Sequence, residues 1–277
     1  MKSPAAAVSF PRAVFERYFR EFDPDRRCTT PNLILLASVE STNLVARRLI
    51  EAYRQEGLEV PEVLVAALHQ SAGRGRLGRT WSSPALQGIY ATLVPSLPGE
   101  CLPTTIPLLV GVALCGELDA LLPAGCRLKW PNDLVATGGK IGGILVEGFA
   151  RAGSAMGVMI GFGINCLETP QDLPAGRATS ILAETGREVS LAELTGSLVA
   201  AIERELRHCA DSAYAVERYR RHSIHRSGER LRCRIADRVV EGVFEGFDSR
   251  GFLRLRVGAE ALLLPSAELL PPEVAAG

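Results

Sequence analysis

The sequence predicts an α+β protein, with a large domain of strands and helices over residues 1–226 and a small β-barrel over residues 227–277. Four strand candidates follow one another within 126–165, with a hairpin signal at Gly138-Gly139, and helical segments come after them. A separate barrel is predicted because the last part of the chain changes to short alternating strands joined by turn residues.

Periodicity and end signals predict the elements of the first half of the chain. Within 12–27 charged residues alternate with aromatic ones, which indicates a short amphipathic helix and not a targeting peptide. The segment 105–122 is apolar almost all round, as in a buried helix. The other elements are a strand at 33–37, a helix capped within 40–43 with Leu44, Val45, Leu49, Ala52 and Tyr53 on its inner face, and strands at 62–69 and 88–94.

The second half contains strands, then helices, then strands again. A capping box, Ser190-x-x-Glu193, marks the start of its longest helix. The predicted strands of the large domain are 126–130, 134–137, 140–149 and 156–165, the helices are 179–184, 190–208 and 214–221, and the barrel strands are 231–235, 239–247, 251–257 and 261–264.

Charge and composition exclude several classes of protein. Lysine plus arginine and aspartate plus glutamate both number 31, so no net field draws the protein to nucleic acid or to a membrane. With 47% hydrophobic and 22% charged residues the chain fits a soluble globular enzyme, and the apolar run 106–114 is too short to span a bilayer. We therefore expect a cytoplasmic protein.

The cysteines and histidines give no sign of a metal site. The seven cysteines are scattered singly, without a C-x-x-C pair, which predicts buried thiols in a reducing cytoplasm rather than disulfides or zinc. They are residues 28, 101, 115, 126, 166, 209 and 233. His222 and His225 have i, i+3 spacing without a cysteine or carboxylate cluster, so we expect them on the surface.

The most informative segment is the glycine-rich loop 73–81, which carries arginines at 74, 76 and 79 and ends on Trp81. Glycines let main-chain N–H groups approach an anion, and arginine adds a permanently charged, forked donor. Trp81 offers a flat face for a base. The loop is therefore predicted to bind nucleotide phosphates, with a solvated basic connection as the alternative.

Two familiar phosphate-binding motifs fail to explain this loop. Gly73, Gly75 and Gly78 satisfy G-x-G-x-x-G after a strand, but Pro84 stops helix growth and another strand follows, which excludes a dinucleotide-binding unit. A P-loop needs lysine and then serine or threonine after its last glycine, and Arg79 stands in the lysine position.

A lysine and a carboxylate occur in two neighbouring segments. Asp133 ends the run 129–133 at a strand end, where it is a candidate Mg²⁺ ligand, with an ordinary Asx turn as the alternative. In 140–147 the two-residue period predicts that Lys140 and Gly142 share a face with Ile144 and Val146. A ligand could then lie along Gly142 while the Lys140 ammonium neutralises a carboxylate and an α-phosphate, the alternative being an exposed lysine.

The segment 161–165 predicts a slot without side chains. Gly161, Gly163 and Asn165 share one face of a strand, which suits a flat or elongated ligand, although a bent sheet corner is an equal alternative. None of the four histidines has a glycine-flanked or acidic context, so covalent catalysis by serine or cysteine is disfavoured.

These segments, in this order, resemble those of the bacterial biotin–protein ligases. They are Ser41-Thr42-Asn43, Gln70–Trp81, Lys129–Leu134, Lys140–Glu147 and Gly161–Asn165, and Ala178–Ile181 is also similar. The resemblance implies a class II synthetase-like fold with a mixed, mostly antiparallel sheet packed with helices, and an SH3-like C-terminal barrel. It also implies the form without the N-terminal DNA-binding domain that some relatives carry.

The resemblance implies a two-step reaction that uses ATP, Mg²⁺ and biotin and no tightly bound prosthetic group. Biotin's carboxylate attacks the α-phosphorus of ATP, giving biotinyl-5′-AMP and pyrophosphate, and a lysine amine of the partner then displaces AMP. The implied partner is the biotin carboxyl carrier protein domain of a biotin-dependent carboxylase. Neither DNA nor a membrane is expected as a partner, and the implied state is a monomer or weak homodimer.

By matching position, the resemblance assigns roles to individual residues. The catalytic residues would be Lys140, Arg76 and Asp133, with Asp133 also at the metal; the biotin site would contain Ser41, Thr42, Asn43, Gln70, Gly73, Arg74, Gly75, Arg76, Lys140, Gly142 and Gly143; and the nucleotide site would contain Arg74, Arg76, Arg79, Trp81, Lys129, Asn132, Lys140 and Asn165. The arginine loop is expected to order over the ligand.

Two other functions are weighed against the ligase. A lipoyl-transferring enzyme of the same fold is disfavoured by the Gly-Arg-Gly-Arg loop and the run 129–133. A non-catalytic biotin sensor is disfavoured because simple binding does not need a cation cluster at the carboxylate.

Overall fold

A seven-stranded mixed sheet forms the centre of the computed structural model, which describes residues 11–24, 28, 32–99, 101–150, 156–170 and 177–270. In the order β1-β2-β3-β7-β6-β5-β4, its strands are β1 (Leu33–Leu36), β2 (Val63–Ala67), β3 (Gly88–Val94), β7 (Met156–Asn165), β6 (Gly139–Ala150), β5 (Asp133–Ala136) and β4 (Arg127–Lys129). β1 and β2 are parallel, and all other neighbouring strands are antiparallel. The predicted α+β fold class is confirmed.

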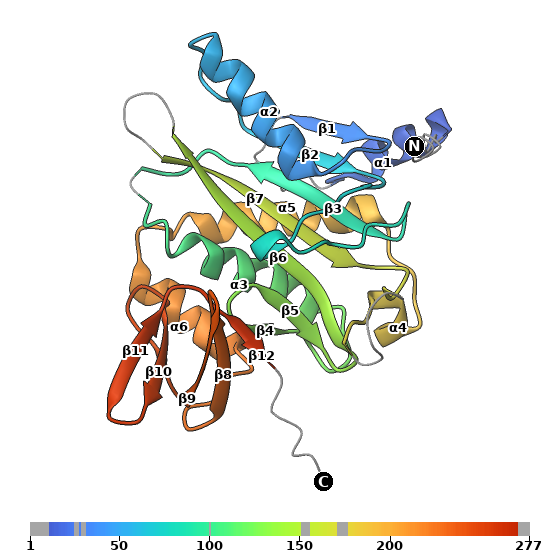
Figure 1. The fold of residues 1–277 in the computed structure, drawn as a ribbon. Coiled ribbons are helices and arrows are strands. Elements are labelled where there is room, and N and C mark those ends of the chain that lie inside the picture. Colours follow the sequence, from blue (N-terminus) through green and yellow to red (C-terminus); the bar gives the residue numbers. More distant parts are fainter. Residues whose placement is uncertain are drawn as a thin grey trace, which may run out of the picture.

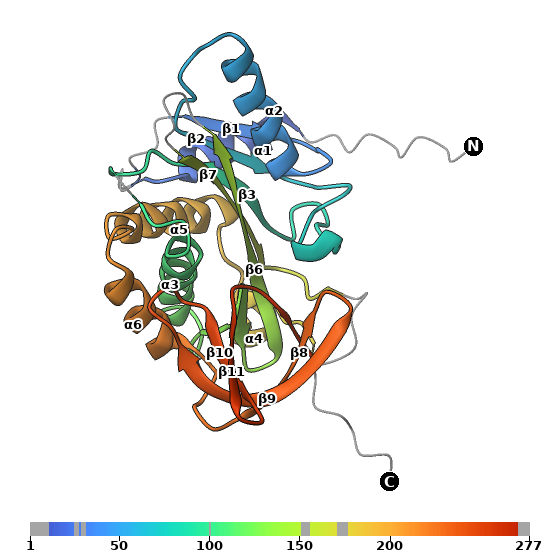
Figure 2. The same cartoon turned by 60° about the vertical axis from the view of Figure 1, so that its left-hand side comes forward.

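Helices lie on both sides of this sheet. Figures 1 and 2 show α3 (Ile106–Asp119), α5 (Leu191–Leu206) and α6 (Ser212–His222) on one side and α2 (Thr42–Gln55) on the other. Buried side chains occur all round α3, as its apolar sequence predicts. α1 (Arg12–Glu21) packs on α5, where the Tyr18 hydroxyl donates to Thr195 Oγ1 at 2.9 Å, and the short α4 (Ile181–Thr185) follows β7.

A second, five-stranded antiparallel sheet follows α6, in the order β11-β10-β9-β8-β12. Its strands are β8 (Arg230–Ile235), β9 (Arg238–Phe247), β10 (Leu253–Val257), β11 (Glu260–Leu264) and β12 (Glu268–Leu270). The sequence predicted this unit as separate, but Phe244 and Leu253 belong to the same buried cluster as α3. Tyr219 of α6 also contacts the Phe247 ring edge-on at 5.3 Å, so the small sheet is packed against the main core.

Two local predictions were wrong by a small shift. On α2 the buried row is 42, 46 and 50, which follows i, i+4 spacing, whereas Ala52 of the predicted inner face is exposed. Val45, Leu49 and Tyr53 flank that row and are partly buried. The hairpin between β5 and β6 turns at 137–138, one residue earlier than predicted, because Ala136 pairs with Gly139.

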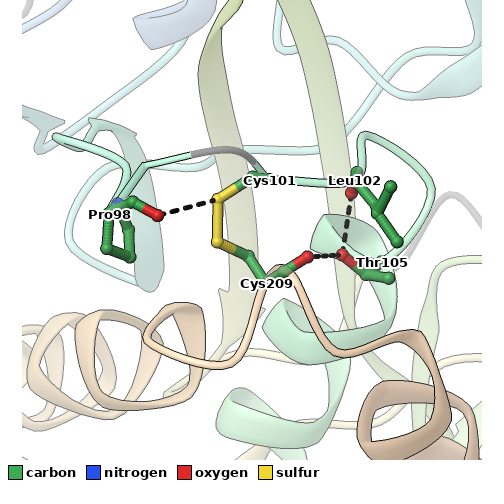
Figure 3. Close-up of a disulfide and its surroundings, with 5 residues drawn as sticks. All are labelled: Pro98, Cys101, Leu102, Thr105 and Cys209. Carbon is green, nitrogen blue, oxygen red and sulfur yellow. Dashed lines mark hydrogen bonds between the residues drawn. A yellow bond between two sulfur atoms is a disulfide. The ribbon is translucent and has the colours of Figure 1, made fainter.

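The cysteine prediction was wrong for one pair. Cys101 and Cys209 form a disulfide that ties the segment before α3 to the turn after α5, with Cα atoms 4.9 Å apart (Figure 3). The Cys209 carbonyl also accepts from the Thr105 hydroxyl at 2.7 Å. No local pattern indicates this pair, because 108 residues separate the two cysteines. Four other cysteines are buried free thiols, as predicted, and Cys28 is half-buried.

The surface assignment of His225 was also wrong. Its side chain is 4% exposed, because the linker between α6 and β8 runs between the two sheets, while His222 is half-buried at the end of α6. Among the residues that the structure describes, no helix is both long enough and apolar enough to cross a membrane.

Candidate active site

A cleft of about 520 Å³ lies between the start of α2, the loop 74–82 and the second sheet, on the face of the main sheet that carries Gly161 and Gly163. The helices α3 and α5 lie on the other side of the sheet (Figure 2). The cleft brings together segments that are far apart in the sequence. The predicted site residues that line it are Ser41, Thr42, Asn43, Gln70, Arg74, Gly75, Arg76, Arg79, Trp81, Lys129, Asn132, Asp133, Lys140, Gly143 and Asn165. Gly73 and Gly142 are not part of its lining.

The predicted face of β6 was wrong, and a β-bulge is the reason. Leu134 pairs with Gly142 but Val135 pairs with Lys140, so Ile141 is an extra residue on β6. Gly142 consequently faces the core, where a Cβ would meet Ile164 and Leu134. Lys140 and Gly143 face the cleft together, because a Cβ on Gly143 would lie 3.4 Å from the Lys140 ammonium nitrogen.

The backbone requires glycine at position 73, which does not line the cleft. A side chain at this position would collide with the Trp81 carbonyl, and the Trp81 N–H donates to the Gly73 carbonyl at 2.9 Å. This contact closes the base of the loop, which then folds into a 3₁₀ turn at Arg76–Gly78 and is followed by β3 and not by an α-helix. The rejection of a dinucleotide-binding unit is thus confirmed.

The slot on β7 exists as predicted, with Phe162 and Ile164 in the core on the opposite face. The Trp81 indole lies across it, since a Cβ on Gly163 would be 2.5 Å from the indole nitrogen. That nitrogen is buried without a hydrogen-bond partner in the structure, and the Lys140 ammonium lies 5.3 Å from the ring centroid. The slot on β7 is therefore wide enough for a flat aromatic ring, which here is the Trp81 indole next to Lys140 of β6.

One end of the cleft is a buried network of neutral polar groups. Gln70 Oε1 accepts from the Thr42 backbone N–H at 2.8 Å, and Gln70 Nε2 donates to Ser83 Oγ at 2.9 Å. The Thr92 hydroxyl lies 2.9 Å from Thr42 Oγ1 and 2.6 Å from Asn43 Oδ1. Ser41 precedes α2 but its hydroxyl makes no capping bond. Such fixed donors and acceptors suit a small uncharged polar ring.

The other end of the cleft is charged. Arg76 donates to Asn132 Oδ1 at 3.0 Å, and the Lys140 ammonium lies 2.6 Å from Asp133 Oδ1. Burial lowers the pKa of Arg76 from its ordinary value, while the nearby Asp133 charge opposes that shift. Arginine nevertheless stays protonated in proteins. Two cations from distant segments thus converge on one place, where developing negative charge would be stabilised.

The second sheet also reaches the cleft, which sequence reasoning missed. Glu268 of β12 forms ion pairs with Arg79 and with Arg234, the latter at 3.1 Å, and Arg76 donates to Ser266 Oγ. Nothing in the local sequence indicates the contacts of Arg76 and Arg79 with the second sheet, since about 190 residues separate these partners. Arg177 and Thr92 were also not predicted; Thr92 sits in the polar network behind α2, and Arg177 lines the cleft.

Comparison with known proteins agrees with this geometry. Residues 35–165 match the model of the biotin/lipoate A/B protein ligase family. A biotin–[acetyl-CoA-carboxylase] ligase of Paracoccus denitrificans is 32% identical over 85% of this chain and 98% of its own length. The chain belongs to the biotin–protein ligase family. A ligase of the same description from Mycobacterium tuberculosis is 30% identical over 86% of this chain and 88% of its own.

Solved structures of biotin–protein ligases share the fold. The ligase of Aquifex aeolicus, determined in complex with biotin and ATP, superposes with a TM-score of 0.69 and 23% identity, covering 87% of this chain and 98% of that one. At this identity the likeness supports the arrangement of the two sheets and helices, and the chemistry rests on the cleft itself.

Two carboxylates line the cleft, Asp133 and Glu268, and Glu268 is engaged in ion pairs with Arg79 and Arg234. Asp133 is the predicted residue, and no cluster of three or more histidine, cysteine, aspartate or glutamate side chains occurs within the part of the chain that the structure describes. A single carboxylate is sufficient for Mg²⁺ that arrives bound to triphosphate oxygens, since magnesium keeps several waters and few protein ligands. The residues therefore fit a metal delivered with the nucleotide.

Proposed function

We propose that the chain is an ATP-dependent biotin–protein ligase whose cleft holds biotin and ATP end to end. The observation that carries this proposal is the convergence of Arg76 and Lys140 in the charged part of the cleft whose other end holds the neutral polar groups. Bringing a carboxylate and a triphosphate together requires neutralisation of both anions, and two fixed cations supply it.

The polar end would bind the ureido ring of biotin. Thr42, Asn43 and Gln70 are held in place by Thr92 and Ser83, so their donors and acceptors are oriented before a ligand arrives. The Ser41 hydroxyl, which caps nothing, would bind the ring directly. Because these groups are uncharged and buried, they favour a neutral hydrogen-bonding ring over an alkyl disulfide such as lipoate.

In the first step, an oxygen of biotin's carboxylate attacks the α-phosphorus and the bond to the β-phosphate oxygen breaks, so pyrophosphate leaves with the electron pair. Lys140 would lie at the carboxyl–phosphate junction, and Arg74, Arg76 and Arg79 would bind the phosphates. Mg²⁺ bound to ATP would add charge neutralisation, with Asp133 as its protein ligand. The adenine would lie beside Trp81, whose indole nitrogen has no partner in the structure.

Lys129, Asn132 and Asn165 would complete the nucleotide side. The structure supports this role for Asn132, because its Oδ1 accepts a hydrogen bond from the Arg76 guanidinium at 3.0 Å. Asn165 donates to the backbone carbonyl of Thr179 at 3.0 Å and thereby fixes the segment next to Lys140.

In the second step, the amine of a partner lysine attacks the acyl carbon, the bond from that carbon to the phosphate oxygen breaks and AMP leaves. The partner would be the biotin carboxyl carrier protein domain of a carboxylase, and the amine proton would pass to Asp133 or to water. A cytoplasmic location and a monomer or weak homodimer remain predictions. The division at residue 226 is also proposed as the domain boundary, and it falls in the linker between α6 and β8.

Exchange of radiolabelled pyrophosphate into ATP tests this function. We expect exchange that depends on biotin and is not supported by lipoate, followed by biotin transfer to a carrier domain. Exchange with lipoate alone would indicate a lipoyl ligase, and binding of biotin without any exchange would indicate a sensor.

A further inference from the structure

A buried histidine lies behind the turn that carries two of the site residues. His225 is in the linker between α6 and β8, and its side chain is 4% exposed. Its Nε2 lies 3.2 Å from the Trp130 backbone nitrogen, and its Nδ1 lies 2.6 Å from Glu229 Oε1. A backbone N–H can only donate, so Nε2 must be unprotonated, and the ring hydrogen on Nδ1 donates to Glu229.

The Trp130 N–H follows directly after β4, at the start of the turn that leads into the cleft. Asn132, two residues on, accepts from Arg76 at 3.0 Å and donates to the Ile144 carbonyl at 2.9 Å. Asp133 then begins β5 and pairs with Lys140. The imidazole therefore holds the start of a turn whose far end orients both cations of the site.

The linker that contains His225 is itself attached to both sheets. The Ile224 N–H donates to the Leu128 carbonyl of β4 at 2.9 Å. Next to Glu229, the Gly228 N–H donates to the Phe244 carbonyl of β9 at 2.8 Å, and the Phe244 N–H returns to the Glu229 carbonyl at 2.8 Å. Glu229, and through it His225, is consequently fixed by the second sheet.

We propose that His225 is a positioning residue for adenylation, which links the second sheet through Glu229 to the turn 130–133 and so fixes Asn132 and Arg76 for ATP. This inference rests on the proposed ligase function. His225 itself would not contact a substrate. It assigns the linker a part in nucleotide binding, while biotin binding at the opposite end of the cleft should not depend on it.

Protonation of the ring would break this link. A hydrogen on Nε2 would face the Trp130 N–H, donor against donor. Four groups face the ring: Glu229 and Arg226 from the linker, Lys129 from β4, and the Phe244 ring of β9, whose centroid is 5.7 Å away. Burial lowers the pKa of His225. The positive charges of Lys129 and Arg226 lower this pKa further, whereas Glu229 raises it. The link is therefore intact near neutral pH and is lost on acidification.

Three variants test the proposal by biotin-dependent ATP–pyrophosphate exchange between about pH 5.5 and 8. His225→Phe keeps a ring but has no acceptor, and His225→Gln places an amide oxygen near the Nε2 position without titrating. His222→Gln is the matched control, since its ring lies three residues earlier and contacts the Arg218 carbonyl at 2.9 Å, away from the cleft lining. Binding of biotin is measured separately by calorimetry.

We expect His225→Phe to raise the KM for ATP about tenfold, the size of losing one hydrogen bond to a buried donor, with biotin affinity unchanged within about twofold. His225→Gln should restore the KM to within about threefold and should lack the loss of exchange that the wild type shows on acidification. His222→Gln should match the wild type in both respects.

The proposal would be overturned if His225→Phe had the same KM for ATP as the wild type. It would also be overturned if His225→Gln lost exchange activity on acidification to the same extent as the wild type. The second result decides the question even if His225→Phe does not fold. Absence of exchange in the wild type would instead refute the ligase function, and the positioning role with it.

Discussion

Replacing Lys140 by methionine is the most informative single change, because it removes one cation and keeps the length of the side chain. The Lys140 ammonium lies 2.6 Å from Asp133 Oδ1 and lines the cleft beside Gly143. If the carboxylate and the α-phosphate meet here, the rate of adenylation depends on this charge. We therefore expect a large loss in kcat with a smaller change in stability.

The structure sets the size of the effect. A unit charge about 4 Å from the reacting anion, at an effective dielectric constant of about 20, is worth roughly 4 kcal/mol. The Lys140 side chain is 30% exposed, so solvent screening reduces this to a range of about 2–4 kcal/mol. That range corresponds to a loss of roughly 30- to 1000-fold in the rate of pyrophosphate exchange.

The assay compares Lys140→Met, Asp133→Asn and the double variant in biotin-dependent exchange. As a control, Arg204→Gln removes a charge that pairs with Glu117 at 3.1 Å on the helix side of the sheet, and it should exchange like the wild type. If Lys140 serves solely to neutralise Asp133, the double variant will recover activity. Such recovery, or a loss below about threefold in Lys140→Met, would refute the reasoning.

Three further predictions concern other parts of the molecule. Addition of biotin and ATP should move the Trp81 indole from Gly163 and change tryptophan emission. Trp81→Phe should abolish this change, leaving the buried Trp130 as the remaining tryptophan; a ligand-induced emission change of wild-type size in Trp81→Phe would contradict the assignment. Glu268→Gln should release Arg79 and Arg234 and increase proteolysis within 74–79 in the absence of ligand. Glu245→Gln is the control, because it frees Arg254 and Arg256 elsewhere on the second sheet and should leave this cleavage unchanged. Equal cleavage in both variants would count against the Arg79–Glu268 contact. Reduction of the Cys101–Cys209 disulfide, which closes a loop of 108 residues, should lower the free energy of unfolding in urea by about 4–5 kcal/mol at most. Alkylation of the unfolded, unreduced protein should label five thiols, and labelling of all seven would contradict the disulfide.

Local patterns predicted the elements and most of the cleft. β3 matches its predicted range because an unbroken apolar run is bounded by turn residues, and the slot of Gly161, Gly163 and Asn165 follows directly from strand alternation. The face of β6 could not be predicted in the same way. A single inserted residue, Ile141, reverses the alternation at Lys140, and a bulge has no clear signature in the sequence of one strand.

Contacts between distant segments were the other limit. β12 has three residues, too few to show a period, yet it brings Glu268 to Arg79. The partner of Cys101 lies 108 residues away, and the burial of His225 depends on how the linker passes between the two sheets. Each of these features is fixed by tertiary packing, which overrides local composition.

The most direct test of the account is a structure of the protein with biotinyl-5′-AMP bound. We predict that the Arg76 guanidinium and the Lys140 ammonium will both lie within hydrogen-bonding distance, about 3 Å, of the phosphate oxygens, with the ureido ring against Thr42 and Gln70. A phosphate bound away from either cation, or an adenylate bound with its ureido ring at the arginine loop, would contradict the central claim.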